Sequence, residues 1–239
     1  STLRRYIDRQ YLDCRNIDLP QTVRFPYTKT SPNTRRKRIN IEFLVNRTYQ
    51  DYQDYSHSTN RTILQLDTVI GSIKDTKCLL TLYEPHTKFQ WGYITHKTAS
   101  SVNHVLSDLV QTLQTNHQLF FDCLLTDNGA EFQSLPQLET TDEGEILLRV
   151  FYCDPYSSFQ KGGCERNHSL IRYVIRKGES LDFVSQDEVN ELFSHINSQK
   201  RKSLSGKTPF QAFFERFHFF PSDFIPVFEV QPSKIKLKK

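Results

Sequence analysis

Apolar residues gather in short runs between positions 62 and 153, and polar, turn-forming segments separate the runs. The runs are rich in β-branched and aromatic residues, a composition that is typical of β-strands. The first three follow one another closely and therefore predict an antiparallel meander. The five predicted strands are 62–70, 78–83, 89–95, 121–126 and 149–153.

Helical periodicity begins after the third run. Apolar residues from Val102 to Leu113 recur at intervals of three and four, which predicts an amphipathic helix between the third and fourth strands. A second helix is predicted to follow the glycines at 162–163 and to reach Arg176. Ser185 to Glu188 has the form of a capping box, and Pro209 follows Thr208 as the first residue of another helix. This order favours an α/β fold of the ribonuclease H-like type, a mixed five-stranded sheet flanked by helices.

The two ends of the chain differ from this middle part. Residues 1–14 have apolar positions at helical spacing, whereas three prolines in 18–33 predict an extended linker. Basic residues concentrate here, since 1–61 holds twelve Lys and Arg against six Asp and Glu. A basic arm of this kind favours a polyanionic partner, although a solvated basic surface explains it equally well. The segment after 220 is predicted to be a frayed tail.

Composition excludes several classes of protein. No stretch approaches the roughly 18 consecutive apolar residues of a membrane helix, and no secretory signal is recognisable at the start. Five cysteines are scattered, odd in number and without a C-x-x-C pair, so a disulfide framework or a zinc finger is not expected. We expect buried thiols in a reducing compartment.

Three acidic residues occupy unusual places. Asp67 stands inside the apolar strand 62–70, where an unpaired charge is costly, although an edge-facing or salt-bridged Asp is the alternative. Asp127 ends the fourth strand, where ligands gather in α/β sheets, but an Asx turn explains it equally simply. Glu165 lies at the start of the predicted helix, on a polar face that could also be an ordinary solvated surface. That face contains Glu165, His168, Ser169, Arg172 and Arg176.

Two longer segments resemble a known family. The sequence LLTDNGAEF at 124–132 is similar to the second-aspartate motif of DDE transposases and retroviral integrases. The sequence FYCDPYSSFQKGGCERN at 151–167 is similar to the third-motif region of bacterial insertion-sequence transposases of the IS-thirty family. In that family a Lys or Arg follows the glutamate by seven residues, and Arg172 follows Glu165 at this spacing. The resemblance covers residues 61–217.

The resemblance implies a DNA transposase that cleaves transposon ends and transfers the strands to target DNA. It assigns Asp67, Asp127 and Glu165 as the catalytic and metal-binding residues, with two Mg²⁺ ions as cofactors and Mn²⁺ as a substitute. Double-stranded DNA is the implied partner, and a homodimer or higher assembly is expected on it, with no membrane and no small-molecule cofactor. The predicted DNA contacts are His168, Arg172, Arg176, Lys177 and the cluster Arg35, Arg36, Lys37 and Arg38.

The same resemblance suggests how the chain is divided. Residues 1–18 are interpreted as a remnant of an N-terminal helix-turn-helix region, 19–60 as a basic linker, 61–220 as the catalytic domain and 221–239 as the tail. Glu131, Asp122 and Asp154 are interpreted as structural acids. The expected location is the bacterial cytoplasm, in association with the nucleoid, or the nucleus of a eukaryotic host.

Three other functions are compatible with parts of the pattern. A ribonuclease H-like nuclease would share the fold and the metals but would not join strands. A non-catalytic DNA-binding protein derived from a transposase would keep DNA affinity without turnover. An interaction domain with acids placed by chance requires the whole set of motifs to be coincidental.

Overall fold

The computed structural model describes residues 44–58, 62–141, 143–155 and 157–235. The chain divides into two units, Ser1–Arg38 and Ile39–Lys239, and all of the described residues belong to the second. The predicted helix at 1–14 and the basic cluster Arg35–Arg38 lie outside the described residues. No helix in the described part is both long and apolar enough to cross a membrane.

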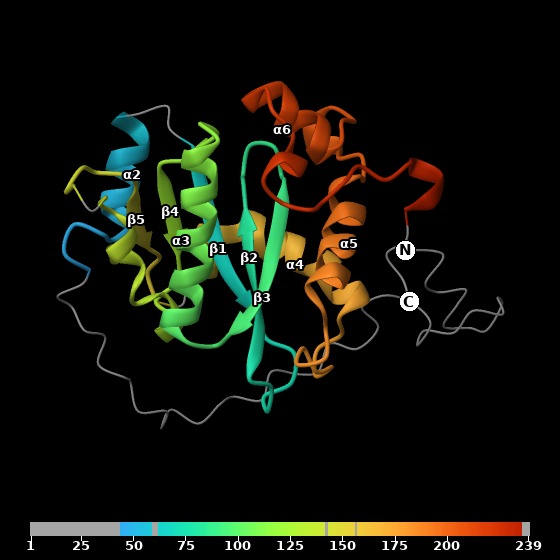
Figure 1. The fold of residues 1–239 in the computed structure, drawn as a ribbon, viewed down its shortest axis with the longest axis horizontal. Helices are drawn as coiled ribbons and strands as arrows, with labels where there is room; N and C mark the ends of the chain where they lie inside the picture. The colour runs from blue at the N-terminus through green and yellow to red at the C-terminus, as the bar shows by residue number, and fades with distance from the viewer. Residues whose placement is uncertain (1–43, 59–61, 142, 156, 236–239) are drawn as a thin grey trace, which may run out of the picture. The chain divides into compact units, whose positions relative to one another are not determined.

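Five strands form one sheet in the order β3-β2-β1-β4-β5 (Figure 1). The first three strands pair antiparallel, whereas β1 pairs parallel with β4, and β4 pairs parallel with β5. This mixed sheet with flanking helices confirms the predicted ribonuclease H-like arrangement. The strands are β1 (Ile63–Val69), β2 (Lys77–Tyr83), β3 (Gln90–His96), β4 (Cys123–Thr126) and β5 (Arg149–Tyr152).

Helices occupy the predicted stretches and one stretch that was predicted as linker. The α-helices are α2 (Tyr49–Ser58), α3 (Ala99–Thr115), α4 (Gly162–Val174), α5 (Gln186–Asn197) and α6 (Pro209–Phe217). Short 3-10 helices connect them: η3 (Ala130–Phe132), η4 (Leu135–Leu138), η5 (Ser158–Lys161), η6 (Lys202–Leu204), η7 (Pro221–Asp223) and η8 (Pro232–Lys234). Side-chain capping boxes at Ser185 and Thr208 start α5 and α6 as the sequence predicts.

Side chains alternate between the two faces of the sheet, so each strand contributes to two apolar layers. Leu64 and Leu66 of β1 lie in the larger core, which also contains the buried stripe of α3. Ile63 lies in a smaller cluster on the opposite face, where Tyr52 and Tyr55 of α2 pack against Phe151. Asp67 has the same parity along β1 as Ile63, which directs it to the face opposite α3.

The structure differs from the predicted division at two places. Helix α2 lies within the predicted linker 19–60, and its tyrosines cover β5 because the aromatic face of the helix would otherwise be exposed. The predicted frayed tail is partly docked, since Ile225 and Val227 are buried in the larger core. Tyr49, Tyr52 and Tyr55 form the aromatic face of α2 among polar residues, and prolines interrupt the apolar residues after 219, so neither segment has a sustained apolar period in the sequence.

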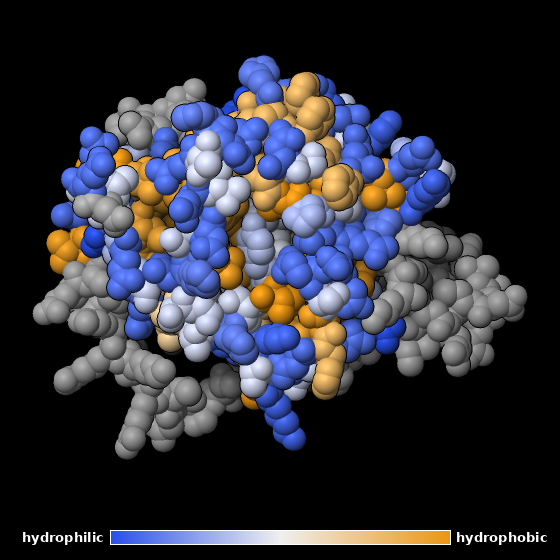
Figure 2. All heavy atoms as spheres, viewed as in Figure 1, coloured by the Kyte–Doolittle hydropathy of each residue, from blue (hydrophilic) through white to orange (hydrophobic). Residues whose placement is uncertain are grey.

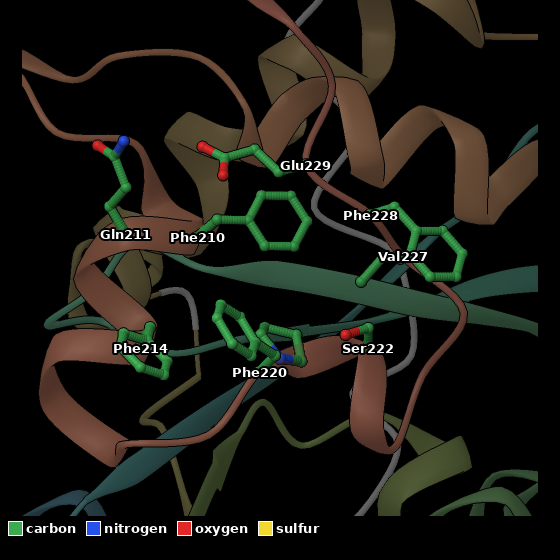
Figure 3. Close-up of a pocket in the computed structure, with 9 residues that line it drawn as sticks. Phe210, Gln211, Phe214, Phe220, Ser222, Val227, Phe228 and Glu229 are labelled. Atoms are coloured by element: carbon green, nitrogen blue, oxygen red, sulfur yellow. The ribbon is translucent and has the colours of Figure 1, made fainter.

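Aromatic residues hold this C-terminal segment on the sheet. Phe120, Phe213, Phe217, Phe219 and Phe224 form a mutual cluster that also contacts Trp91 of β3. A shallow pocket borders the cluster between α6 and the segment after it, where Phe214 stacks on Phe220 at 4.4 Å (Figure 3). Apolar atoms are accordingly visible on the surface near α6 (Figure 2).

Helix α5 protects the outer edge of the sheet. The backbone N–H of Gln90 donates to Asn197 Oδ1 at 3.0 Å, and Asn197 Nδ2 donates to the Gln90 carbonyl at 2.6 Å. Gln186, at the start of the helix, makes the same pair of bonds with the backbone of Ile94 and Gly92. These bonds satisfy groups of edge strand β3 that would otherwise be open to pairing with another chain.

We expect Asn197→Leu to lower the free energy of unfolding by about 2–4 kcal/mol, because it leaves two buried backbone groups of Gln90 without partners. Urea titration followed by circular dichroism measures the change. Asn116→Leu is the matched control, since Asn116 is exposed at the end of α3 and should change stability by less than about 0.5 kcal/mol. Equal effects of the two variants would contradict the edge-capping role.

Candidate active site

Two of the predicted acids lie near the carboxyl ends of adjacent parallel strands, Asp67 within β1 and Asp127 just after β4. The parallel register aligns Leu64 with Leu124 and Gln65 with Leu125. Asp67 and Asp127 stand two residues beyond the last of these pairs, so the register continued along both strands places them opposite each other. The side chain of Asp67 is 18% exposed and that of Asp127 is exposed. The carboxyl ends of parallel strands are where ligands gather in α/β sheets.

The charges of both carboxylates act on one buried thiol, that of Cys153. Burial raises the pKa of this thiol to about 12, and the charges of Asp127, Asp154 and Asp67 act in the same direction. The ammonium of Lys161 acts against them. Cys153 follows β5 directly, and its N–H donates to the carbonyl of Thr126 at 2.7 Å. The acids of β1 and β4 therefore share one small region with the end of β5.

Asp67 is held on both carboxylate oxygens. The N–H of Thr68 donates to Asp67 Oδ1 at 2.8 Å, and Lys161 Nζ lies 3.7 Å from the same oxygen. His168 Nδ1 lies 3.7 Å from Oδ2. Contacts on both oxygens hold the Asp67 side chain in one orientation.

Lys161 is a site residue that sequence reasoning did not find. Its side chain is only 6% exposed, and its ammonium donates to the carbonyl of Leu66 at 2.9 Å while facing Asp67. A lysine is almost never so buried unless it is paired. Its position four residues before Glu165 was the available signal, but composition alone gives no reason to place this cation inward.

Glu165 belongs to the first turn of α4, and its side chain lies outside the described residues. Its neighbours on the helix are described. Cys164 is fully buried, and its Sγ lies 4.0 Å from Thr81 Oγ1 on β2. His168, one turn later, reaches the same threonine through Nε2 at 3.0 Å. The backbone that bears Glu165 is thus held against the strands β1 and β2, next to Asp67.

The polar face of α4 differs from the prediction at His168. Glu165, His168 and Arg172 were expected on one polar face, opposite the apolar residues that face the core, but the His168 side chain is only 17% exposed and packs inward. The reason is that its partners, Asp67 on β1 and Thr81 on β2, are polar groups on the part of the sheet against which α4 packs. A polar residue can therefore belong to the packed side of a helix when the opposing strand offers hydrogen-bonding groups.

The predicted DNA contacts fall into two groups. Arg176 and Lys177 are exposed in the segment that follows α4. Arg172 is half-buried, donates through Nη2 to the carbonyl of Ile70 at 2.8 Å, and has its pKa lowered by burial. Arg172 therefore joins α4 to the end of β1 in addition to any role with DNA.

The neighbouring acids have local partners. Glu131 accepts a hydrogen bond from Thr68 Oγ1 at 2.9 Å, so it braces the residue after Asp67. Asp154 accepts from Gln160 Nε2 at 2.8 Å, and its own N–H donates to Gln160 Oε1. Both contacts agree with the structural role expected for these residues.

Curated proteins of similar sequence were found. A probable transposase of the insertion-like sequence element IS1161 from Streptococcus salivarius is 26% identical over 205 residues, which is 84% of this chain and 54% of that protein. A transposase of the element IS1086 from Cupriavidus metallidurans is 35% identical over 80 residues, or 34% of this chain and 23% of that protein. The transposase InsI of the element IS30A from Escherichia coli is 32% identical over 113 residues, or 47% and 28%.

The chain resembles insertion-sequence transposases. The match to InsI confirms the predicted likeness to the IS-thirty type, although no family model matches the chain. The chain spans about half of the IS1161 relative and less than half of the other two.

Solved structures of retroviral integrases are also similar to this transposase-like chain. The HTLV-2 integrase catalytic core domain in complex with magnesium has a TM-score of 0.39 at 18% identity and covers 64% of this chain and 95% of that one. The simian T-cell lymphotropic virus intasome, in complex with the PP2A regulatory subunit B56 gamma, has a TM-score of 0.45 at 18% identity, with coverage of 72% and 59%.

Proposed function

We propose that the chain carries the catalytic region of a DNA transposase, which cleaves transposon ends and joins them to target DNA with divalent metal ions. The observation that carries the proposal is the register of β1 and β4, which places Asp67 opposite Asp127 near the carboxyl ends of the two strands, with α4 packed against β1. The sequence similarity to insertion-sequence transposases supports the same reaction.

The donor set fits a hard cation. Carboxylate oxygens are the preferred ligands of Mg²⁺, and Mn²⁺ accepts the same ligands. We propose that Asp67, Asp127 and Glu165 hold two such ions. When bound, the ions would activate the attacking oxygen and stabilise the leaving oxygen of the phosphodiester.

The surrounding residues have distinct parts in this proposal. Thr68 and Lys161 fix one oxygen of Asp67, and His168 fixes the other. Glu131 acts through Thr68, because it accepts a hydrogen bond from the Thr68 hydroxyl. Water attack would nick the transposon end, and attack by the exposed 3′-hydroxyl would join it to target DNA. Neither step needs a covalent bond to the protein, so no Ser or Tyr nucleophile is required.

DNA binding is proposed for the cations near this end of the sheet. Arg176 and Lys177 are exposed and available for phosphate contacts, and the cluster Arg35–Arg38 is proposed to grip the DNA backbone as well. Phosphate contact by His168 and Arg172 stays a prediction, since each already bonds within the protein. We further propose that a homodimer or larger assembly forms on paired ends.

A joining assay tests the proposed function. The full 239-residue chain is incubated with a branched DNA that mimics a transposon end joined to target, and with plain duplex DNA, in Mg²⁺ or Mn²⁺. We expect metal-dependent rearrangement of the branched DNA with strand joining. Hydrolysis without any joined product would favour the ribonuclease H-like nuclease, and DNA binding without turnover would favour the non-catalytic alternative.

Lys161 provides a prediction about metal binding. Lys161→Met keeps the buried volume but removes a positive charge 3.7 Å from Asp67 Oδ1. We expect the affinity for Mn²⁺ to rise by about tenfold, because the ammonium no longer repels the cation. Electron paramagnetic resonance of unbound Mn²⁺ measures the affinity in the absence of DNA. Lys177→Met, which removes an exposed charge beyond the C-terminal end of α4, should leave the Mn²⁺ affinity unchanged.

A further inference from the structure

One group of side chains near Asp67 combines three kinds of metal ligand. Asp67, Cys164 and His168 each offer one ligand atom, and these atoms lie within 4.8 Å of one another. The strand β1 supplies the carboxylate. Helix α4 supplies the thiol and the imidazole from positions one turn apart, so that both project from the same side of the helix.

The contacts within this group are close to ligand spacing. His168 Nε2 lies 3.5 Å from Cys164 Sγ, and His168 Nδ1 lies 3.7 Å from Asp67 Oδ2. Around a tetrahedral Zn²⁺ with bonds of about 2.0–2.3 Å, neighbouring ligand atoms stand roughly 3.3–3.8 Å apart. One imidazole nitrogen binds one ion, so the His168 ring must turn to face the ion together with both partners. The rotation gives up the 3.0 Å contact between His168 Nε2 and Thr81 Oγ1, and the ligand atoms, which lie within 4.8 Å of one another, must then move about 1 Å closer.

The chemistry of the group selects a different class of ion from that proposed for the acidic triad. Mg²⁺ prefers oxygen ligands, whereas thiolate and imidazole select Zn²⁺ and related transition metals. We propose that Asp67, Cys164 and His168 form a binding site for a thiophilic divalent cation of the Zn²⁺ class. Binding releases the thiol proton of Cys164 to solvent, since the thiolate is the ligand.

Asp67 can serve this site without losing its other contacts. His168 approaches Oδ2, while Thr68 and Lys161 contact Oδ1. A zinc-class ion would therefore use the oxygen that faces α4 and leave the Lys161 contact in place. If Asp67 also holds Mg²⁺, which rests on the proposed function, the two classes of ion compete for one carboxylate and zinc inhibits the enzyme.

Cobalt is the probe for this site because a thiolate ligand gives Co²⁺ a near-ultraviolet charge-transfer band. The reduced full chain is titrated with Co²⁺ in buffer without Mg²⁺ and without DNA. We expect one Co²⁺ per chain with this band, loss of the band in Cys164→Ser, and at least tenfold weaker binding in His168→Gln. Cys153→Ser is the matched control, because Cys153 is the other buried thiol near Asp67 and its loss should change nothing.

Several results would overturn the proposal. These are a titration without a thiolate band, a band that survives Cys164→Ser, or a band that disappears with Cys153→Ser. If Cys164→Ser fails to fold, as judged by circular dichroism, X-ray absorption of the zinc-loaded parent chain replaces it. That spectrum should contain one sulfur at about 2.3 Å together with nitrogen or oxygen, and a shell without sulfur contradicts the site. Neither measurement involves DNA turnover, so the fate of this proposal and that of the transposase proposal are separable.

Discussion

Asp67→Asn is expected to reduce metal-dependent DNA cleavage and joining by about a thousandfold or more, which corresponds to roughly 4 kcal/mol of barrier height. Asparagine has nearly the same shape and keeps an oxygen that can accept the bond from the Thr68 N–H. It loses the negative charge that draws a cation to the end of β1. The activity is measured as joined and cleaved product with Mg²⁺, and the fold is checked by thermal denaturation.

Asp154→Asn is the matched control for this experiment. Asp154 also contributes negative charge near Cys153, but its carboxylate is occupied by Gln160. We expect this variant to keep its activity within a few-fold of the parent chain, because asparagine can still accept the Gln160 bond. Near-normal turnover in Asp67→Asn would show that the reaction does not need this carboxylate. An equal loss in both variants would show that the general negative charge of the region matters and that Asp67 has no special role.

Gly163→Ala is expected to damage both the fold and the activity, because the first turn of α4 packs closely against β2. A Cβ at this position would lie 2.6 Å from Tyr83 Cε1 and 3.1 Å from Tyr83 Oη. Tyr83 is buried, so its ring has little room to move. The first turn of α4 must then shift. We expect a loss of about 1–3 kcal/mol in the free energy of unfolding and about a hundredfold loss of activity.

The adjacent glycine offers a precise comparison. A Cβ at Gly162 meets nothing within 4 Å, and the residue lies in the same helical turn. Gly162→Ala should therefore keep activity and gain up to about 1 kcal/mol of stability from helix propensity. Chemical denaturation and the joining assay on both variants distinguish the contact with Tyr83 from a general effect of alanine. Identical behaviour of the two variants would mean that α4 does not need its close approach to β2.

The strands and most helices were predictable because their apolar periods are complete. The run from Ile63 to Val69 is interrupted by charge only at Asp67, and the stripe from Val102 to Leu113 covers three turns of α3. Asp127 was predicted as a site residue from its position at the end of a strand and from its motif. The motif spacing also predicted Glu165 as a site residue. Each of these signals is local in sequence, so it can be recognised without knowledge of the fold.

Contacts between distant residues were not predictable. Lys161 reaches the carbonyl of Leu66 across 95 positions, and Asn197 reaches Gln90 across 107. Periodicity placed His168 on the polar face of the helix, but it contained no information about the polar partner Asp67 on β1 that draws this side chain inward. The residues around a site are thus harder to predict than the motif that marks it, since they depend on which elements the fold brings together.

Crystals of the chain soaked in Mn²⁺ would test most directly whether the acids share cations. We predict an anomalous peak that lies about 2.1–2.2 Å from carboxylate oxygens of both Asp67 and Asp127, with Glu165 as a further ligand of the same centre. Mn²⁺ bound to Asp67 without Asp127 and Glu165, or no Mn²⁺ at this end of the sheet, would contradict the account.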